Sequence, residues 1–568
     1  MRKLIPLAAC LFVGIAITAA AQPGPEKLAG SWKVTFLDSG ELLTFWILNL
    51  ETKDGKLTGT PDAVAQGPGG GAPLKDVTLK GDTLTATFEY AGMPMVFTMN
   101  VPKGQVKQMG GTMAFRGNTY VAQMQSAKKD AAKDAKWRDK VDVPYLTEFK
   151  EFKEELAKRV NDLGIFVLAP ESVAAAAKEK VSAADLKAAL APVLNAARDH
   201  GAWHQETLLK LAGQLAKQES YAPMGEEFAQ QALKEFGAAA DENTQLKCFD
   251  IIAMSLEKQN KKAELTKIRA KIDGLEIKGH EENEKAGLGF EPGKFAGRQG
   301  KRVVLVELFT GAQCPPCVAA DLAFEGLAKT FKTSEVVLLQ YHLHIPRPDP
   351  MTTPDSEARQ QYYGKEVRGT PSIFFNGISA AGGGGAKAGA GNKYKQYRDI
   401  VDPLLNSDDV VNVVVNQALK DKNENGGTIT FQPFSKIDIA ADAKRTGDAI
   451  AITASAKGYK PADKLKLRLA LIEPWVRYPG SNGLSYHAHV VRALPGGPDG
   501  FALDKENISK TVKVDLAEVR QIADRHLQKQ DSFFQGQRAF SYRNLRLVAF
   551  VQDDDSKEIL HAVEVDVK

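Results

Sequence analysis

The spacing of hydrophobic and polar residues changes three times along the 568-residue chain. Residues 28–125 contain short β-prone runs separated by Gly, Pro, Asn and Asp, which is typical of antiparallel β structure. Residues 144–276 place apolar side chains at the three- and four-residue spacing of amphipathic helices. Residues 291–405 combine continuous apolar runs with helical segments, and residues 406–568 return to short β-prone runs. The pattern predicts a multidomain α+β protein.

The first β region is expected to form a barrel-like antiparallel domain. Its opening residues Gly30-Ser31-Trp32 resemble the Gly-x-Trp start of lipocalin-type barrels, a resemblance that covers three residues. A Trp at this position usually plugs a core, so we expect a packing or binding module. Residues 126–140 (SAKKDAAKDAKWRDK) carry charges of both signs and predict a solvated linker helix. The predicted strands cover residues 31–37, 42–50, 83–90, 95–101 and 120–125.

The region from 144 to 276 is expected to form a helical domain. Ser182-Ala183-Ala184-Asp185 is a capping-box start before apolar residues at helical spacing. The paired segments resemble tetratricopeptide-type hairpins, although no consensus spacing repeats. Cys248 lies in an apolar helical stretch, so we expect a buried, reduced and slowly reacting thiol. Further helices are predicted over 203–217, 223–236, 242–258 and 261–273.

The region from 291 to 405 predicts a parallel α/β layer. Strands are expected over 302–309, 336–342 and 372–375, with helices over 314–331 and 356–363 between them. The Gly- and Ala-rich residues 380–391 predict a flexible loop inside this domain.

The final region, 406–568, predicts an immunoglobulin-like β-sandwich interrupted by one helix over 516–530. His487 and His489 share one strand face and are expected to be solvated. The candidate strands are 436–443, 448–456, 465–473, 485–492, 509–515, 543–552 and 559–567.

Composition and charge narrow the class of protein. Hydrophobic residues make up 43% and charged residues 25%, which excludes a disordered or collagen-like chain. The net charge of +4 is too small for the extended basic surface of a general nucleic-acid-binding protein. Four cysteines in 568 residues exclude a disulfide-dense scaffold. We therefore expect no nucleic-acid partner.

The first 21 residues predict export. Met1-Arg2-Lys3 is a basic start, an apolar run follows, and Ala19-Ala20-Ala21 offers a cleavage site before Gln22. We expect a periplasmic or extracellular protein without a transmembrane span. The run ending at Cys10 resembles a bacterial lipobox, but the apolar stretch continues beyond it. A lipid-anchored form is therefore the less favoured alternative.

The candidate chemistry lies in Cys314-Pro315-Pro316-Cys317, which directly follows a predicted strand and opens a predicted helix. A two-residue spacer in the first helical turn lets two sulfur atoms bond. Free N–H groups and the helix dipole stabilise the thiolate of the first cysteine, which attacks a disulfide, and the second cysteine resolves the product. We predict a disulfide between Cys314 and Cys317, with Cys314 as the nucleophile and a pKa below that of free cysteine. His342 and His344 share a strand face, and His342 is a candidate charge near Cys314.

Residues 303–376 resemble the thioredoxin fold, through the dithiol motif and Gly369-Thr370-Pro371 before the strand Ser372–Phe375. The segment VELFTGAQCPPC is also similar to the corresponding segment of a family of secreted thioredoxin-like proteins. The resemblance implies a cis peptide before Pro371, which packs on the cysteines, and a substrate groove that includes Thr370.

The resemblance also bears on proton transfer. The family's buried acid matches Glu307 only with one inserted residue, and Gln313 stands where the family has Trp. Glu307 and His342 are therefore candidates for proton transfer or for tuning the thiol pKa.

Three interpretations of the motif stay open: an exchange-active site, a permanent structural disulfide, and half of a zinc site completed by histidines. We favour the first, with no metal and no organic cofactor, because structural zinc sites usually use four closely patterned ligands. The sequence predicts an exported thiol–disulfide oxidoreductase. Its partners would be exported proteins with thiols or disulfides, and a membrane or exported redox protein. The alternative is a non-enzymatic envelope or secreted binding protein that keeps the fold and a structural disulfide.

Overall fold

The computed structural model describes residues 24–568 except 39, 66–68, 91–92, 116–117, 160–161, 199–202, 238–239, 415–426 and 531–540. The expected signal peptide, with Cys10, lies outside the described residues. The chain divides into two compact units, Met1–Lys271 and Ile272–Lys568. Both contain sheets and helices, so the prediction of a multidomain chain of mixed α and β content is confirmed. Within the described ranges, no helix combines the length and hydrophobicity that a membrane crossing needs.

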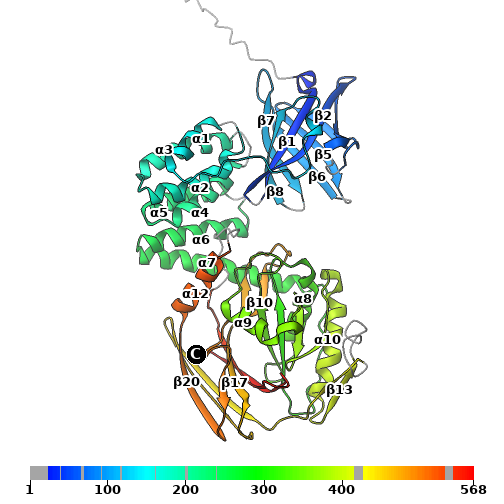
Figure 1. Ribbon diagram of the computed structural model, residues 1–568, viewed down its shortest axis with the longest axis vertical. Helices are drawn as coiled ribbons and strands as arrows, with labels where there is room; N and C mark the ends of the chain where they lie inside the picture. The colour runs from blue at the N-terminus through cyan, green and yellow to red at the C-terminus, as the bar shows by residue number, and fades with distance from the viewer. Residues whose placement is uncertain are drawn as a thin grey trace, which may run out of the picture. The chain divides into compact units, whose positions relative to one another are not determined.

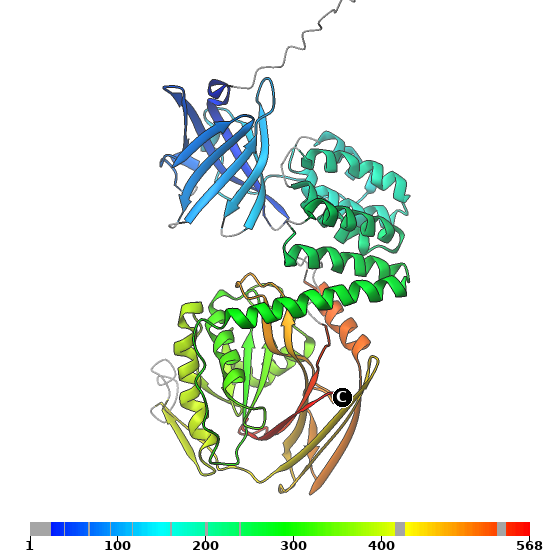
Figure 2. The same cartoon turned by 180° about the vertical axis from the view of Figure 1, so that it is seen from behind.

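The first unit begins with eight antiparallel strands that form a nearly closed, barrel-like sheet (Figures 1 and 2). Neighbours along the sheet run in the order β3-β2-β1-β8-β7-β6-β5-β4, and β3 contacts β4 across the gap. Three of these strands, β3, β4 and β7, were not predicted, because they are short or rich in Gly and polar residues. The strands are β1 (Gly30–Asp38), β2 (Glu41–Lys53), β3 (Lys56–Pro61), β4 (Asp76–Lys80), β5 (Thr83–Tyr90), β6 (Met93–Asn100), β7 (Gln108–Phe115) and β8 (Asn118–Ser126).

Side chains fill the interior of this sheet. Trp32 is buried, and its indole N–H donates to the carbonyl oxygen of Leu28 at 2.8 Å. The rings of Phe45, Trp46 and Phe97 lie 4.5–5.4 Å apart in the same core. The interior cavity beside Trp46 measures about 10 Å³, roughly the space of one water molecule. Trp32 therefore serves as part of a packed core, as expected.

The charged segment 126–140 differs from its prediction. It contains only the 3-10 turn Ala131–Lys133 rather than a helix. Its backbone pairs with β2 instead, since the amide of Arg138 donates to Thr44 and the amide of Thr44 donates to Asp139. Ala132 is buried against Ile47. Backbone pairing to a neighbouring strand here outweighs the helical propensity of Ala and Lys.

The rest of the first unit is helical. The capping start at Ser182 is confirmed, because its hydroxyl accepts from the amide of Asp185 at 3.1 Å. The first two helices were not predicted, and the last is longer than expected and continues into the second unit. The helices are α1 (Phe149–Lys158), α2 (Ile165–Lys178), α3 (Ala183–Arg198), α4 (Trp203–Ala216), α5 (Ala222–Phe236), α6 (Glu242–Lys258) and α7 (Lys262–Ala286).

The second unit is built on a nine-stranded sheet. Its order is β12-β11-β9-β10-β18-β17-β21-β22, with β19 paired to β17. β9 (Val304–Thr310) and β10 (Val336–His342) are parallel, and β11 (Ser372–Phe375) runs antiparallel to β9. Every residue of β9 and β10 is buried, so their continuous apolar runs reflect cover on both faces.

Helices cover both faces of this part of the sheet (Figure 1). Val304, Val306 and Leu308 pack with α8 (Val318–Thr330) and α10 (Ala390–Leu405). Leu305 and Phe309 point to the opposite face, toward α9 (Pro354–Tyr363). Thr353 caps α9, because its hydroxyl accepts from the amide of Ser356 at 3.1 Å. The alternation in β9 decides which side chains can reach the cysteines.

Five of the C-terminal strands belong to the same sheet as β9 and β10. β18 pairs with β10 in parallel, so residues on both sides of the expected 405/406 boundary share one sheet. The three-stranded sheet β15-β16-β20 shares a hydrophobic core with β17 and β21. A further hairpin pairs β13 with β14. The remaining elements are β12 (Ile378–Ala381), β13 (Val411–Val414), β14 (Thr428–Phe431), β15 (Asp438–Thr446), β16 (Ala449–Lys457), β17 (Ala462–Arg477), β18 (Tyr486–Ala493), β19 (Phe501–Leu503), β20 (Asn507–Asp515), α12 (Leu516–Gln528), β21 (Arg546–Asp553) and β22 (Ile559–Asp566).

Candidate functional site

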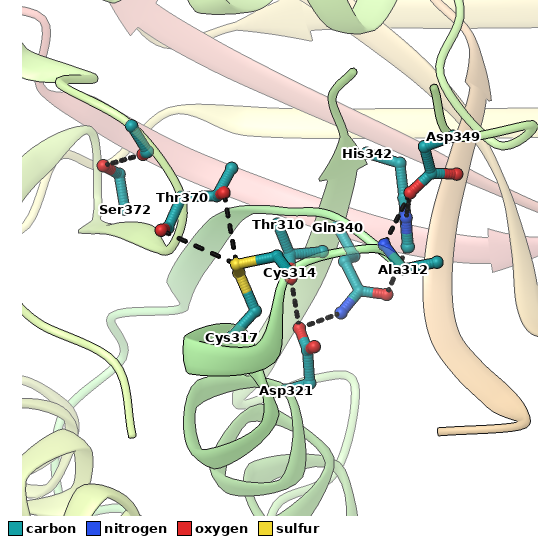
Figure 3. Close-up of a disulfide and its surroundings, with 11 residues drawn as sticks. Thr310, Ala312, Cys314, Cys317, Asp321, Gln340, His342, Asp349, Thr370 and Ser372 are labelled. Atoms are coloured by element: carbon teal, nitrogen blue, oxygen red, sulfur yellow. Dashed lines mark hydrogen bonds and ion pairs between the residues drawn. A yellow bond between two sulfur atoms is a disulfide. The ribbon is translucent and has the colours of Figure 1, made fainter. Parts of the chain in front are cut away.

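A disulfide joins Cys314 and Cys317 at the junction of β9 and α8 (Figure 3). Cys314 is the N-cap of the 3-10 turn Pro315–Cys317, which continues into α8. The amide of Cys317 donates to the carbonyl of Cys314 at 3.1 Å, so the motif forms the first helical turn, as predicted. Both prolines occupy positions where a helix has no internal acceptor for an N–H group. The exposed fraction is 2% for Cys314 and 0% for Cys317.

The loop before β11 contacts the first sulfur. The Thr370–Pro371 peptide is cis, as the resemblance implies. The Thr370 hydroxyl donates to Cys314 Sγ at 3.3 Å, and the Thr370 carbonyl oxygen lies 3.7 Å from the same atom (Figure 3). A disulfide sulfur has no proton to donate, so the second contact becomes a hydrogen bond only when Cys314 is a reduced thiol.

Two loops cover the motif. The amide of Gly385 donates to the Pro316 carbonyl at 2.6 Å, and the amide of Ala319 donates to the Gly385 carbonyl at 3.0 Å. A Cβ atom at Gly384 would lie 2.0 Å from the Pro316 oxygen. The stretch expected to be a flexible loop over 380–391 is therefore bound to the turn that carries the disulfide, and its last residues begin α10 at Ala390.

The second covering loop joins β17 to β18. Gln313 donates from Nε2 to the Tyr478 hydroxyl at 3.1 Å, and its Oε1 accepts from the amide of Ser481. The amide of Asn482 donates to the Ala312 carbonyl at 3.2 Å. Gln313 stands where the thioredoxin pattern has Trp, and here it fastens a loop of the C-terminal region over the motif.

Asp321 is the buried acid on the side of the disulfide, and the sequence analysis missed it. It follows Cys317 by four residues in α8, so both lie on one face of the helix. Its Oδ1 accepts from the Thr310 hydroxyl at 2.6 Å and from Gln340 Nε2 at 3.1 Å. Burial raises its pKa to about 7, although the Thr310 hydrogen bond and the charge of His342 oppose this. The signal in the sequence was a lone acid in an otherwise apolar helical turn.

His342 lies at the centre of a buried polar chain. Its Nδ1 is 2.8 Å from Asp349 Oδ2, and its Nε2 is 3.3 Å from Gln340 Oε1. Asp349 Oδ2 also accepts from the amide of Ala312 at 2.6 Å. Burial disfavours the Asp349 carboxylate, but the charge and hydrogen bond of His342, with backbone amides, outweigh burial and lower its pKa.

The chain Ala312–Asp349–His342–Gln340–Asp321 therefore connects the loop before Cys314 to the acid beyond Cys317 (Figure 3). Both ring nitrogens of His342 face acceptor oxygens, one of Asp349 and one of Gln340. His342 reaches the motif through Asp349 and the Ala312 amide.

Glu307 does not occupy the place proposed for it. It belongs to the face of β9 that carries Leu305 and Phe309, opposite Thr310. Arg359 of α9 binds both of its oxygens, at 2.7 and 3.0 Å, and the Tyr363 hydroxyl also donates to it. The proton-transfer role proposed for Glu307 is therefore corrected to a buried ion pair that joins β9 to α9.

Two further histidines differ from their predictions. His487 and His489 are buried rather than solvated, because β18 is an interior strand of the shared sheet. Burial lowers the pKa of His487 to about 3 and that of His489 to about 4. The His487 ring lies 5.0 Å from the His342 ring, edge to face. His487 is therefore neutral beside His342.

Cys248 agrees with its prediction. It is fully buried in α6 and forms no disulfide in the part of the chain that the structure describes. Burial raises the pKa of its thiol to about 12. A thiol this weakly acidic contributes almost no thiolate at neutral pH.

Comparison with known proteins assigns the chain to no family. No family model matches, and no curated protein matches. One solved structure that matches is HBP35 of Porphyromonas gingivalis, at a TM-score of 0.30 and 15% sequence identity. The match covers 47% of this chain and 76% of that chain. A similarity of this size carries no inference about fold or function.

Proposed function

We propose that this protein is an exported thiol–disulfide oxidoreductase whose module 303–376 is thioredoxin-like. The order β9, α8, β10, α9, β11 and β12 supports the fold assignment, with β9 and β10 parallel and β11 antiparallel on the other side of β9. The export assignment rests on the first 21 residues alone. The immunoglobulin-like and helical-hairpin descriptions of the other regions stay predictions.

The observation that carries the proposal is the position of the disulfide between two distinct groups. Cys314 Sγ touches the Thr370 hydroxyl and carbonyl, where an incoming substrate sulfur would be oriented. Cys317 is followed one turn later by Asp321, a carboxyl group with a pKa of about 7. A group that titrates near neutral pH is suited to proton transfer. A purely structural disulfide needs no such acid.

The exchange reaction follows from these positions. In the reduced protein the Cys314 thiolate attacks one sulfur of a substrate disulfide, a mixed disulfide forms, and the other substrate sulfur leaves as a thiolate. Cys317 then loses its proton to the Asp321 carboxylate and attacks Cys314 Sγ. The second substrate sulfur leaves, and two electrons have passed from the protein dithiol to the substrate. The reverse steps oxidise a substrate dithiol, and an exported or membrane redox protein renews the starting form.

One observation favours a second candidate, a non-enzymatic binding protein with a structural disulfide. The cysteines are almost fully buried beneath the loops at 382–386 and 478–484. Exchange requires at least one of these loops to move. Four consecutive glycines, Gly382–Gly385, give the first loop the backbone freedom to do so.

Turnover of a protein disulfide distinguishes the two functions. The mature chain should reduce insulin when a small dithiol is supplied, and Cys314→Ser should abolish the activity. Cys248→Ser is the matched control, because it removes a buried cysteine remote in sequence from the motif and should leave turnover unchanged. Equal activity of the wild type and Cys314→Ser would reject the enzyme and favour the binding protein.

A further inference from the structure

Three side chains that the redox site does not use converge in the second unit. His344 follows β10 by two residues, Glu357 lies in the first turn of α9, and His526 lies in the last turn of α12. One nitrogen or oxygen atom from each lies within 4.8 Å of the other two. The three residues come from separate elements, so their convergence is a product of the tertiary fold rather than of local spacing.

The two histidines leave nitrogen atoms without partners. Nε2 of His344 and Nε2 of His526 are buried and have no hydrogen-bond partner among the described residues. Nε2 of His526 lies 3.3 Å from Glu357 Oε1, outside hydrogen-bond geometry. Buried polar atoms without partners are uncommon in folded proteins, and a bound ion can supply the missing partner.

The two rings are stacked at a distance that a shared ion allows once one ring turns to bring its nitrogen toward the other. The ring centroids of His344 and His526 are 5.2 Å apart, and their planes differ by 20°. Two imidazoles on one tetrahedral zinc ion, with Zn–N bonds of about 2.0–2.1 Å, have centroids roughly 5 Å apart. The Glu357 side chain is 36% exposed, so water can reach the cluster from its side.

We propose that His344, Glu357 and His526 bind one divalent transition-metal ion, with Zn²⁺ as the best match, and leave a coordination position open to water. Two imidazole nitrogens favour zinc or a neighbouring transition metal over Mg²⁺ and Ca²⁺, which prefer oxygen ligands. Two histidines, one glutamate and an open position form a recurrent zinc ligand set. The proposal goes beyond the redox function and does not depend on it.

Binding requires one local change. Nδ1 of His344 accepts from the amide of Asp349 at 3.0 Å, which leaves the proton of the neutral ring on Nε2. A metal at Nε2 needs that proton to move to Nδ1, so the ring must turn away from the Asp349 amide. We therefore expect weaker binding than at a four-ligand structural zinc site. The lost hydrogen bond also adjoins Asp349, which holds the Ala312 amide next to the redox motif.

The test is a zinc titration of the full mature chain in its oxidised form, against a chromophoric chelator. In this form Cys314 and Cys317 cannot act as ligands. Wild type should bind one Zn²⁺ per chain, and zinc should raise its unfolding temperature. Glu357→Gln should weaken binding at least tenfold, and His526→Gln should abolish it. His280→Gln, a partly buried histidine outside the cluster, is the matched control and should bind like wild type.

Two outcomes would overturn the proposal: no zinc binding by wild type, or wild-type affinity in both cluster variants. Glu357→Gln keeps the size of a partly exposed side chain, so it decides the question if His526→Gln does not fold. Co²⁺ provides a second readout. Its visible spectrum should show bound cobalt without a sulfur-to-metal charge-transfer band, whereas such a band would assign the ion to a cysteine.

Discussion

At the scale of residues, the proposed exchange chemistry depends most on one carboxyl group, that of Asp321. It is buried, lies one turn beyond Cys317, and bonds to Thr310 and Gln340. One of its oxygens, Oδ2, has no hydrogen-bond partner within the described residues. Burial removes water from the carboxylate, and this oxygen gains no hydrogen bond from the described residues in return. The charged form is therefore disfavoured, and the pKa rises to about 7.

Asp321→Asn should make the protein more stable and less active. The pKa of the carboxyl rises from 3.8 to about 7 on folding, so the folded state binds the proton more tightly and loses stability as pH rises between these values. Asn removes that loss. The variant should be more stable than wild type by on the order of 2–4 kcal/mol at pH 8, and the difference should shrink below pH 4. Insulin reduction should fall by roughly 100-fold, the lower range for losing a proton-transfer group.

Glu307→Gln is the control, because it alters the buried acid on the other face of β9. It leaves the Arg359 charge without its partner and should destabilise the protein by about 3–5 kcal/mol. Turnover per folded molecule should stay near that of wild type. If Asp321→Asn is destabilising at pH 8, or if its turnover equals that of wild type, the assigned role of Asp321 is wrong.

At the scale of elements, the junction of β9 and α8 depends on its covering loops. The Gly-rich loop approaches so closely that a Cβ at Gly384 would lie 2.0 Å from the Pro316 oxygen and 3.0 Å from Pro371 Cδ. Glycine is therefore needed at this position because the two backbone segments approach too closely to leave room for a Cβ atom. We expect this loop to limit the access of reagents to Cys314.

Gly384→Ala should displace this loop and expose the disulfide. We expect a phosphine reductant to open the Cys314–Cys317 bond several-fold faster than in wild type, measured by mass spectrometry of alkylated thiols. Gly385→Ala is the matched control, since its Cβ would meet Ala319 at an ordinary 3.4 Å. Identical rates for the three proteins would show that the loop does not control access.

Element by element, the predictions succeeded where periodicity was strong. The apolar runs of β9 and β10 and the capped start of α3 were located from residues alone. The Gly-rich stretch was mistaken for a free loop, because its order comes from the distant Pro316 carbonyl. Glu307 was misassigned for a related reason: the match to a family position did not say which face of the strand the side chain would occupy.

At the scale of the whole molecule, the second unit is stabilised by the nine-stranded sheet that its segment 291–405 and its C-terminal strands share. The core on the α9 face combines Val303, Leu305 and Phe309 with C-terminal residues such as Phe550 and Ile559. Periodicity located seven of the C-terminal strands and missed the short strands β13, β14 and β19. It could not show that β18 would pair with β10, because partner choice depends on contacts far apart in the chain. For the same reason, the sequence could not predict that the β17–β18 loop binds Gln313 or that His487 is buried.

This sharing predicts that residues 291–405 do not fold alone. Without the C-terminal strands, β10 loses its neighbour β18 and the α9-side core loses its apolar partners. The isolated segment should show no cooperative thermal transition by circular dichroism, while residues 272–568 should show one. A cooperative transition in the short segment would mean that the two parts are independent domains.

The central claim is that Cys314 exchanges disulfides and Cys317 resolves them. Trapping tests it most directly, because removing the resolving cysteine stops the reaction at the mixed disulfide. Reduced Cys317→Ser should form a stable mixed disulfide with a model substrate, and peptide mapping should place the bond at Cys314. Reduced Cys314→Ser should form none, because Cys317 lies inside the helical turn and the contacts with the Thr370 loop belong to Cys314. A mixed disulfide at Cys317 in the Cys314→Ser variant, or none in either variant, would contradict the account.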